Sequence, residues 1–453
     1  MRKNLIFGAF MMCSLLGHGQ VPAVKTFGMK GNPIVTDKFT ADPAPMVHDG
    51  TLYLYVGHDE ARDGEMFNIT EWLCYSTKDM KTWTDHGAVL KPTDFSWAVG
   101  EAWASQVVEK NGKFYYYTTV QAGEPYTGKA VGVAVGDSPT GPFKDAIGKP
   151  LVTDAMTPNG KRGWWNDIDP TVFIDDEGTP WLSWGNGTCF LAKLKSNMTE
   201  LDGEIQILEL PHYVEGPWLH KRGDLYYLTY ASMGKGREMI HYATAESIGG
   251  TWTYRGALTG MAENSFTIHP GIIEFKGQWY LFYHHNDYSP EFDKNRSARI
   301  DSLFFNPDGT IQKVTPTLRG VGITDARKEI QLDRYSRLSN QGAAIDYLNQ
   351  ANKFEGWKTL LSKNGAWVQY NRVNFGDSTP RKVKARVTSD NGGTLQIRIN
   401  GTNGPVISEI KVPKTDKWTN IESSVRSAPT GIHDLYVSLK GNGKVEIDWI
   451  SFQ

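Results

Sequence analysis

One pattern recurs five times between residues 42 and 283 of this 453-residue chain. Each copy has a short apolar stretch, a turn that contains glycine, and a segment in which aromatic residues alternate with other types. Two alternating segments joined by such a turn form a β-hairpin, and similarity at a period of tens of residues indicates a repeat architecture. The copies begin at Asp42, Trp103, Asp169, Glu215 and His269.

A second hairpin follows most copies, with a turn of small residues and then an aromatic residue, as in residues 76–83, 138–143 and 247–252. Two hairpins make a four-stranded blade, so the repeats predict an all-β fold with a five-bladed β-propeller. The 47 glycines, above the roughly 7% of an average protein, fit many tight turns. A stack of β-sandwiches would also contain hairpins, but it would not require a polar residue at the same position of five copies.

The first residues of the copies carry the functional inference. The innermost strands of a propeller all run in the same direction, so residues that begin them converge at one end of the central channel. An aspartate before proline often only starts a turn, and a single histidine is usually structural. Three carboxylates, a tryptophan and a histidine at matched positions favour a catalytic site.

Two chemistries suit three converging carboxylates, namely metal binding and glycosidic cleavage. Glycosidases use one carboxylic acid to protonate the leaving oxygen and one carboxylate to activate water or to attack the sugar. A third carboxylate nearby raises the pKa of the acid by charge repulsion. Trp103, Trp164 and Trp165 suit stacking on sugar faces, although Trp164 and Trp165 fit packing at the rim equally well.

These motifs resemble glycoside hydrolase family 43, whose members are inverting enzymes with five-bladed propellers. The resemblance covers nearly all of residues 30–320. It is carried by the sequences TADP at 40–43, AWASQV at 102–107, DIDPTVF at 167–173, EGPW at 215–218, HPGI at 269–272 and NPDGTI at 306–311.

The resemblance implies a role for each carboxylate. Asp42 is expected to be the general base that activates water, and Glu215 the general acid. Asp169 is expected to raise the pKa of the acid and to orient it. Trp103 and Trp165 are expected to bind substrate.

It also implies roles for an arginine and a histidine. Arg296 matches an arginine that contacts the substrate or the Asp169 region, and Arg299 competes for that role because the local sequence departs from the family pattern. His269 matches an axial histidine that often lies beside a calcium ion or a water cluster. We therefore expect no cofactor for the chemistry and a calcium ion near His269.

Several short sequence segments resemble those of family members that remove arabinose from arabinoxylan, among them residues 57–60, 132–135 and 218–222. The sequence thus predicts an inverting α-L-arabinofuranosidase that acts on arabinoxylan or a related plant polysaccharide. The alternatives are a β-xylosidase or exo-arabinanase on the same scaffold, a glycan-binding propeller without activity, and a calcium-dependent structural protein.

The N-terminus resembles a signal peptide. Arg2 and Lys3 precede an apolar run over residues 5–16, and small residues follow at 17–19. The run is too short to span a bilayer. We predict a signal peptide over residues 1–19 and a secreted or periplasmic protein, with a lipoprotein anchor at Cys13 as the weaker alternative.

Charge and cysteine content limit the partners. Lys and Arg total 48 against 50 Asp and Glu, and this net charge of −2 gives no field that would attract nucleic acid or an anionic membrane. We expect a monomer without a membrane span. After removal of residues 1–19, Cys74 and Cys189 are expected to be unpaired or buried thiols.

A second domain is predicted after the propeller, which is expected to occupy residues 20–325. Residues 326–453 contain short alternating segments, including 366–371, 394–400 and 434–439, which predict a β-sandwich of jelly-roll type. Residues 431–437 and 445–452 resemble a family 6 carbohydrate-binding module. Tyr370, Trp357 and Asn442 are candidate sugar contacts, whereas Trp367 and Trp449 are expected in the core. A docking role without sugar remains the alternative.

Overall fold

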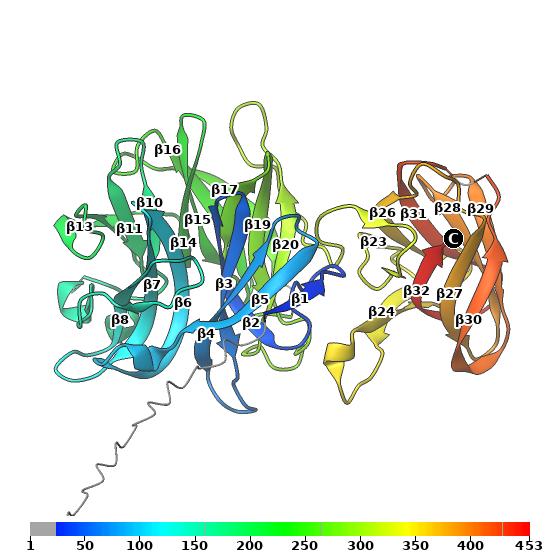
Figure 1. Ribbon diagram of the computed structural model, residues 1–453, viewed down its shortest axis with the longest axis horizontal. Helices are drawn as coiled ribbons and strands as arrows, with labels where there is room; N and C mark the ends of the chain where they lie inside the picture. The colour runs from blue at the N-terminus through cyan, green and yellow to red at the C-terminus, as the bar shows by residue number, and fades with distance from the viewer. Residues whose placement is uncertain (1–23, 158, 263, 428) are drawn as a thin grey trace, which may run out of the picture.

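The computed structural model describes residues 24–157, 159–262, 264–427 and 429–453. The described chain is almost entirely β and forms a larger unit, β1–β20, and a smaller one, β21–β32 (Figure 1). The predicted signal peptide, residues 1–19, lies outside the described residues. Among those described, no helix is long and apolar enough to cross a membrane. The helical elements of the described residues are four short 3-10 turns: η1 (Pro92–Asp94), η2 (Asp154–Met156), η3 (Gly163–Trp165) and η4 (Lys353–Glu355).

The larger unit is built from antiparallel strand groups that follow one another along the chain, each begun by one repeat copy. The first two groups share a nine-stranded sheet, and three further sheets have four, four and three strands. The nine-stranded sheet contains β1 (Lys25–Gly28), β2 (Phe39–His48), β3 (Thr51–Asp59), β4 (Ile69–Thr77), β5 (Thr82–Leu90), β6 (Ala98–Lys110), β7 (Lys113–Ala122), β8 (Lys129–Gly136) and β9 (Lys144–Asp145). The other three contain β10 (Thr171–Ile174), β11 (Pro180–Trp184), β12 (Cys189–Leu194) and β13 (Leu201–Leu208); β14 (Tyr213–Arg222), β15 (Leu225–Met233), β16 (Glu238–Ala245) and β17 (Thr253–Met261); and β18 (Gly271–Phe275), β19 (Gln278–His285) and β20 (Ser297–Leu303).

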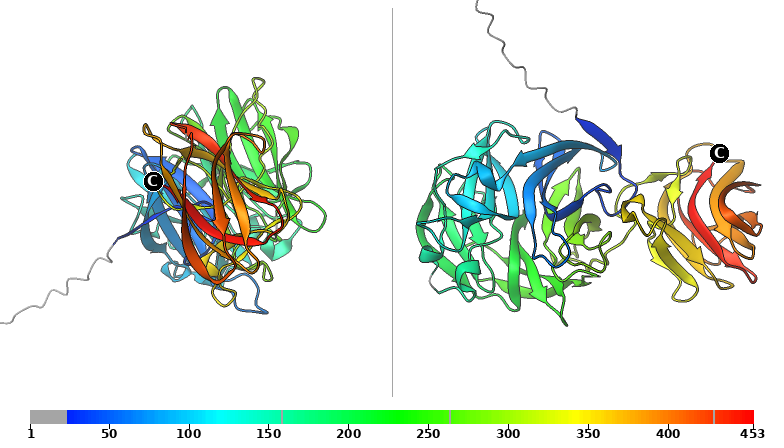
Figure 2. Two further views of the ribbon diagram at one scale, coloured as in Figure 1. Left: turned by 90° about the vertical axis from the view of Figure 1, so that its right-hand side faces the viewer. Right: turned by 90° about the horizontal axis from the view of Figure 1, so that it is seen from below.

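The strand groups close into a ring around a common centre (Figure 2). The first strands of the groups contact one another in cyclic order: β2 with β6, β6 with β10, β10 with β14, β14 with β18, and β18 with β2. Closure of this kind is how propellers protect the edges of their sheets. The starts of these strands therefore gather at one end of the ring.

Apolar clusters between neighbouring groups hold the ring together. Aromatic residues alternate along the strands, so one side chain in two points into the gap between sheets. Full burial of a large apolar side chain contributes about 1.5–3 kcal/mol. In order around the ring, the clusters are represented by Trp72 with Tyr116, Tyr117 with Trp184, Trp181 with Leu228, Trp218 with Leu281, and Leu54 with Phe282.

The smaller unit consists of two six-stranded sheets packed on one apolar core. One sheet contains β21 (Thr324–Asp325), β23 (Arg337–Leu338), β26 (Trp367–Asn374), β28 (Gly393–Ile399), β29 (Val406–Val412) and β31 (Ile432–Lys440). The other contains β22 (Ile330–Gln331), β24 (Ala343–Tyr347), β25 (Trp357–Leu361), β27 (Lys382–Ser389), β30 (Thr415–Ser424) and β32 (Val445–Phe452). Strict alternation of buried residues, as along β27 and β28, places one face of each sheet on the core.

Two details of the smaller unit bear on the sequence analysis. β21 precedes residue 326 and pairs in parallel with β26 of the smaller unit. Trp367 and Trp449 are partly exposed instead of buried in the core. Trp367 packs on Tyr436 across the sheet, with ring centroids 5.7 Å apart.

Candidate active site

A cavity of about 250 Å³ lies where the first strands of the ring begin. The residues to which the sequence analysis assigns a catalytic, substrate-binding or metal role in the propeller line it, except the alternative candidates Trp164 and Arg299, together with side chains that the analysis did not select. The predicted residues are Asp42, Trp103, Trp165, Asp169, Glu215, His269 and Arg296. The others include Phe67, Arg162, Asn186, Glu238 and His284.

Breaks in strand pairing aim the carboxylates into this cavity. Register shifts fall between Ala41 and Ala44 in β2 and around Glu215 in β14. Asp42 and Asp169 adopt positive φ values of 50° and 61°. Bulges re-aim side chains, and a left-handed aspartate is uncommon outside turns and functional sites. The Asp-Pro pairs that could have been simple turn formers thus bend the first strands at the cavity.

Gly216 makes the corresponding bend beside Glu215. Its φ is +61°, and a Cβ atom there would lie 2.9 Å from Cδ2 of His269. Its N–H donates a 3.0 Å hydrogen bond to Oδ2 of Asp169. The glycine therefore allows the backbone to pass between His269 and Asp169 and fixes Glu215 relative to both.

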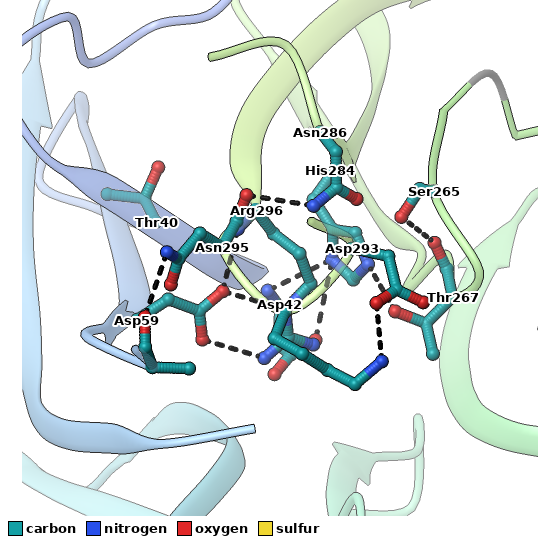
Figure 3. Close-up of polar contacts among 12 residues, drawn as sticks. Thr40, Asp42, Asp59, Ser265, Thr267, His284, Asn286, Asp293, Asn295 and Arg296 are labelled. Atoms are coloured by element: carbon teal, nitrogen blue, oxygen red, sulfur yellow. Dashed lines mark hydrogen bonds and ion pairs between the residues drawn. The ribbon is translucent and has the colours of Figure 1, made fainter. Parts of the chain in front are cut away.

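Asp42 is buried against a positive charge (Figure 3). Nη1 of Arg296 lies 2.9 Å from its Oδ1. The Asp42 N–H donates to Nδ1 of His284 at 3.2 Å, which assigns the imidazole proton to Nε2, 3.1 Å from Oγ1 of Thr267. Burial raises the pKa of Asp42 and the Arg296 charge opposes that rise. Burial and Arg296 hold the pKa of His284 well below its ordinary value, so His284 is neutral.

A second carboxylate holds Arg296 in place. Asp59, at the end of β3, accepts hydrogen bonds from Nε and Nη2 of Arg296 at 2.8 and 2.9 Å, and also from its backbone N–H at 2.8 Å. A two-pronged pair of this kind fixes the plane of the guanidinium. Nη1 is thereby directed at Asp42.

Arg299, the competing candidate, does not line the cavity. Its side chain pairs with Asp287, with Nε 2.8 Å from Oδ2. The structure thus places Arg296 in the cavity, and its direct ion pairs are with Asp42 and Asp59 rather than with the Asp169 region.

Glu215 and Asp169 form a coupled acidic pair. Nδ2 of Asn186 lies 3.3 Å from Oε2 of Glu215. Burial, followed by the charge of Asp42, raises the pKa of Glu215 to about 7. Burial and the charge of Glu215 raise the pKa of Asp169 well above its ordinary value. Both shifts favour the protonated forms of these two groups, whereas Asp42 has a guanidinium to stabilise its ionised form.

Trp103 and Trp165 form an aromatic wall of the cavity, with ring centroids 5.1 Å apart. The buried ammonium of Lys129 lies 5.0 and 4.4 Å from the two ring centroids and pairs with Glu101. Aromatic faces of this kind stack on sugars. Trp164 is 59% exposed and does not line the cavity.

His269 is buried at the floor of the site without a hydrogen-bond partner for either ring nitrogen. Its nearest carboxylate oxygen is Oδ2 of Asp169, 3.9 Å from Nε2. The described residues contain no group of three histidine, cysteine or acidic side chains placed to hold a metal ion. Calcium prefers six to eight oxygen ligands, so the residues around His269 are a poor donor set for it. No chemical step is assigned to such an ion.

Sequence reasoning missed three buried groups of the site, namely Asp59, His284 and Glu238. Oε2 of Glu238 accepts the Ile268 N–H at 2.9 Å, and burial with the charge of Glu215 raises the pKa of this fourth carboxyl group. None of the three begins a first strand. Asp59 is the last residue of the second strand β3 and His284 the last but one of the second strand β19, a regularity that could have identified them.

Comparison with known families assigns both units. Residues 30–311 match glycosyl hydrolases family 43, and residues 339–453 match the family 6 carbohydrate-binding module. An arabinoxylan arabinofuranohydrolase from Bacillus subtilis (strain 168) is 30% identical, over 91% of this chain and 90% of its own length. A xylosidase/arabinosidase from Bacteroides ovatus is also 30% identical, over 61% of this chain and 95% of its own.

Solved structures agree with these relatives. The crystal structure of a family 43 arabinoxylan arabinofuranohydrolase from Bacillus subtilis, in complex with cellotetraose, has a TM-score of 0.55 and 26% identity and covers 93% of this chain and 97% of that one. The structure of an α-L-arabinofuranosidase from Clostridium thermocellum has a TM-score of 0.52 and 35% identity. It covers 63% of this chain and 97% of that one. With its family match spanning more than half of its length, the chain belongs to glycosyl hydrolases family 43 and is a glycoside hydrolase with a β-propeller followed by a β-sandwich.

Proposed function

We propose that this enzyme releases terminal α-L-arabinofuranose from arabinoxylan or a related plant polysaccharide, with inversion at the anomeric carbon. The observation that carries the proposal is one cavity in which Asp42, Asp169 and Glu215 meet beside the Trp103–Trp165 wall. The arabinoxylan arabinofuranohydrolase from Bacillus subtilis, which aligns with 91% of this chain, supports the choice of substrate.

In the proposed mechanism Asp42 is the general base and Glu215 the general acid. Asp42 takes a proton from a water molecule whose oxygen attacks the anomeric carbon. The bond from that carbon to the leaving oxygen breaks, and Glu215 donates its proton to the leaving oxygen. Solvent then restores the starting protonation of both groups.

The charges around each carboxyl group suit these roles. Arg296 favours the ionised form of Asp42, as a base requires. Burial keeps the pKa of Glu215 near 7, so the acid carries its proton at mildly acidic pH. Asp169 accepts the Gly216 N–H and so holds the backbone next to the acid.

A β-xylosidase or exo-arabinanase is the second candidate activity. The xylosidase/arabinosidase from Bacteroides ovatus supports it, as does the 30%-identical structure of a family 43 enzyme from Xanthomonas citri complexed with xylose. Both activities need the same acid and base, so they differ only in the sugar that fits the cavity. A glycan-binding propeller without activity is not favoured, because family membership identifies an enzyme.

We further propose five blades for the propeller, in accord with the cyclic contacts of its five first strands. The domain limits at residues 20–325 and 326–453, removal of residues 1–19, export and a monomeric state remain predictions. A calcium ion near His269 likewise remains a prediction, and the proposed chemistry requires no metal.

Sugar binding by the sandwich is also a proposal, supported by the match to the family 6 module. Two of the predicted contacts are not accessible to a ligand. Trp357 is buried against Tyr288, and Tyr370 lies under the guanidinium of Arg319. Asn442 is exposed. A separate cavity of about 250 Å³ beside Trp418 offers a tryptophan for stacking.

The proposal is tested by incubating the enzyme with arabinoxylan and identifying the released sugar by chromatography. Glu215→Gln keeps the shape of the acid but has no proton to donate at the required acidity. We expect arabinose from the wild type and a rate at least about 100-fold lower from the variant, the usual size of a general-acid contribution. Isothermal titration should show that the variant still binds oligosaccharide.

The matched control is Glu209→Gln, which changes an exposed glutamate close in sequence to the same strand. Its rate should equal that of the wild type. Release of xylose alone would mean that the enzyme is a β-xylosidase, within the second candidate activity. Full activity of Glu215→Gln would remove Glu215 from the role of acid.

A further inference from the structure

The turn between β24 and β25 of the sandwich rests on the propeller, next to the elements that carry Asp42 and Arg296. We call residues 347–357 the bridging segment. The ring of Phe354 lies between two propeller rings, 4.9 Å from the centroid of Phe39 and 5.0 Å from that of Tyr288. Phe39 begins β2, three residues before Asp42, and Tyr288 belongs to the loop of residues 286–296 that ends at Arg296.

Several further contacts hold this loop from the sandwich side. The Tyr347 hydroxyl donates a 2.6 Å hydrogen bond to the carbonyl oxygen of Asp287. Trp357 stacks on Tyr288 with centroids 4.8 Å apart, and Lys353 pairs with Glu291. Aromatic stacking and a partly buried hydroxyl hydrogen bond fix position more precisely than exposed ion pairs do.

Hydrogen bonds within the loop connect these contacts to Arg296. Nδ2 of Asn286 donates to the carbonyl oxygen of Asn295 at 2.8 Å (Figure 3). It also donates to the carbonyl oxygen of Phe292 at 3.2 Å. The Ser289 hydroxyl donates to the same Phe292 oxygen at 2.6 Å. The loop is thus a compact unit, and a shift at Tyr288 moves the residue that precedes Arg296.

Phe354 is also connected to the ion pair of Arg296 and Asp42 through its second contact, Phe39 of β2. The N–H of Thr40, next to Phe39, donates to the carbonyl oxygen of Arg296 at 2.8 Å, and the Thr40 hydroxyl accepts the Ala298 N–H at 3.0 Å. The bridging segment therefore touches both backbones whose relative position sets the 2.9 Å distance from Arg296 to Asp42.

We propose that the bridging segment positions the base: Phe354, Tyr347 and Trp357 are positioning residues that hold β2 and the loop of residues 286–296 in register for hydrolysis. The sandwich then contributes to catalysis on any substrate, apart from binding polysaccharide. This inference rests on the proposed role of Asp42. A misplacement of about 1 Å in a catalytic group can lower a rate on the order of 100-fold, so a modest shift is measurable.

The test uses full-length Phe354→Ala and the small aryl glycoside that the wild type cleaves fastest, because such a substrate does not report polysaccharide binding. We expect kcat to fall by about tenfold with KM within about twofold, because substrate contacts remain while the base is misplaced. Hydrogen exchange should rise over residues 39–42 and 286–296 and stay unchanged in the other strands of the propeller.

Two variants complete the design. Phe354→Tyr keeps the ring and should restore kcat. Trp367→Ala removes another partly buried ring of the sandwich, one that packs on Tyr436 of the same sheet, and should leave kcat and exchange at the site unchanged. Wild-type kcat and unchanged exchange in Phe354→Ala would overturn the inference, as would an equal loss in Trp367→Ala. An inactive wild type would count against the proposed function, and hydrogen exchange would still test the positioning.

Discussion

At the scale of single residues, Arg296 sets the charge balance of the cavity. It joins the proposed base to Asp59 and opposes the rise in the pKa of Asp42 that burial causes. The groups that face Asp42 from the surrounding elements are Arg296, the neutral His284, and the acidic Asp59, Asp169, Glu215 and Glu238. Arg162 also lines the cavity, but Arg296 is the cation that pairs with Asp42, and removing it would leave the base without an ion-pair partner.

The profile of kcat/KM against pH tests this balance. In the wild type, activity should fall above pH 7 as Glu215 loses its proton, and fall at low pH as Asp42 gains one. Arg296→Met removes the charge that favours the carboxylate, so the pKa of Asp42 should rise and the acidic limb should move to higher pH. The control Arg337→Met changes an exposed arginine of the sandwich. An acidic limb that stays in place or moves to lower pH would contradict the role of Arg296.

At the scale of elements, the bends at the start of the first strands convert a propeller repeat into a catalytic site. A regular strand would alternate its side chains between the two faces of a sheet. Positive φ at Asp42 and Gly216 interrupts this alternation in β2 and β14, and positive φ at Asp169 bends the chain just before β10. Backbone strain of this kind is found at functional sites, where the surrounding structure maintains it.

Two glycine substitutions distinguish the effect of the bend on activity from the effect of backbone strain on stability. Gly216→Ala and Gly223→Ala both place alanine at positive φ, +61° and +57°, in the same hairpin. Each should cost about 1–2 kcal/mol of stability, measured by thermal unfolding. Only the Cβ at residue 216 meets His269, so Gly216→Ala should also lose most of kcat. Equal activity of the two variants would show that the backbone at residue 216 does not position Glu215.

At the scale of the whole molecule, the two units share a buried junction. Arg334 of the sandwich is buried; it donates to the carbonyl oxygen of Asn32 and, at 3.0 Å, to the Tyr288 hydroxyl, and lies over the ring of Trp357. It also opposes the effect of burial, which raises the pKa of its neighbour Asp333 to about 7. The junction therefore couples the stability of the units.

Calorimetry of Arg334→Met tests this coupling. Breaking a buried ion pair by removing one partner costs about 3–5 kcal/mol. We expect one unfolding transition in the wild type, and a lower or divided transition in the variant. The control Arg337→Met, at an exposed position of the same unit, should unfold like the wild type. Identical transitions in all three proteins would mean that the units unfold independently.

The sequence was most informative where polar or aromatic residues recur at a fixed place in the repeat. The five residues that begin the copies line one cavity, because strands that run in the same direction bring equivalent positions together. The strand predicted at residues 394–400 is β28, which begins and ends one residue earlier. Both free cysteines of the described chain, Cys74 and Cys189, are buried, as expected.

Features that depend on contacts between distant segments could not be predicted. Asp59 and His284 reach the site from the ends of second strands, and nothing in the local sequence distinguishes them from other polar strand residues. Trp357 was a candidate sugar contact, because the sequence around it does not show that the ring of Tyr288 stacks on it. The sequence could not decide between Arg296 and Arg299 either, because it does not show that Arg296 pairs with Asp42 and Arg299 with Asp287.

The most direct test of the account is proton NMR of the enzyme acting on arabinoxylan during the first minutes, before the sugar anomers equilibrate. The arrangement of Asp42 as base and Glu215 as acid predicts free arabinose that appears first as the inverted anomer. Initial release of the retained anomer would contradict the assignment of Asp42 as a base that activates water.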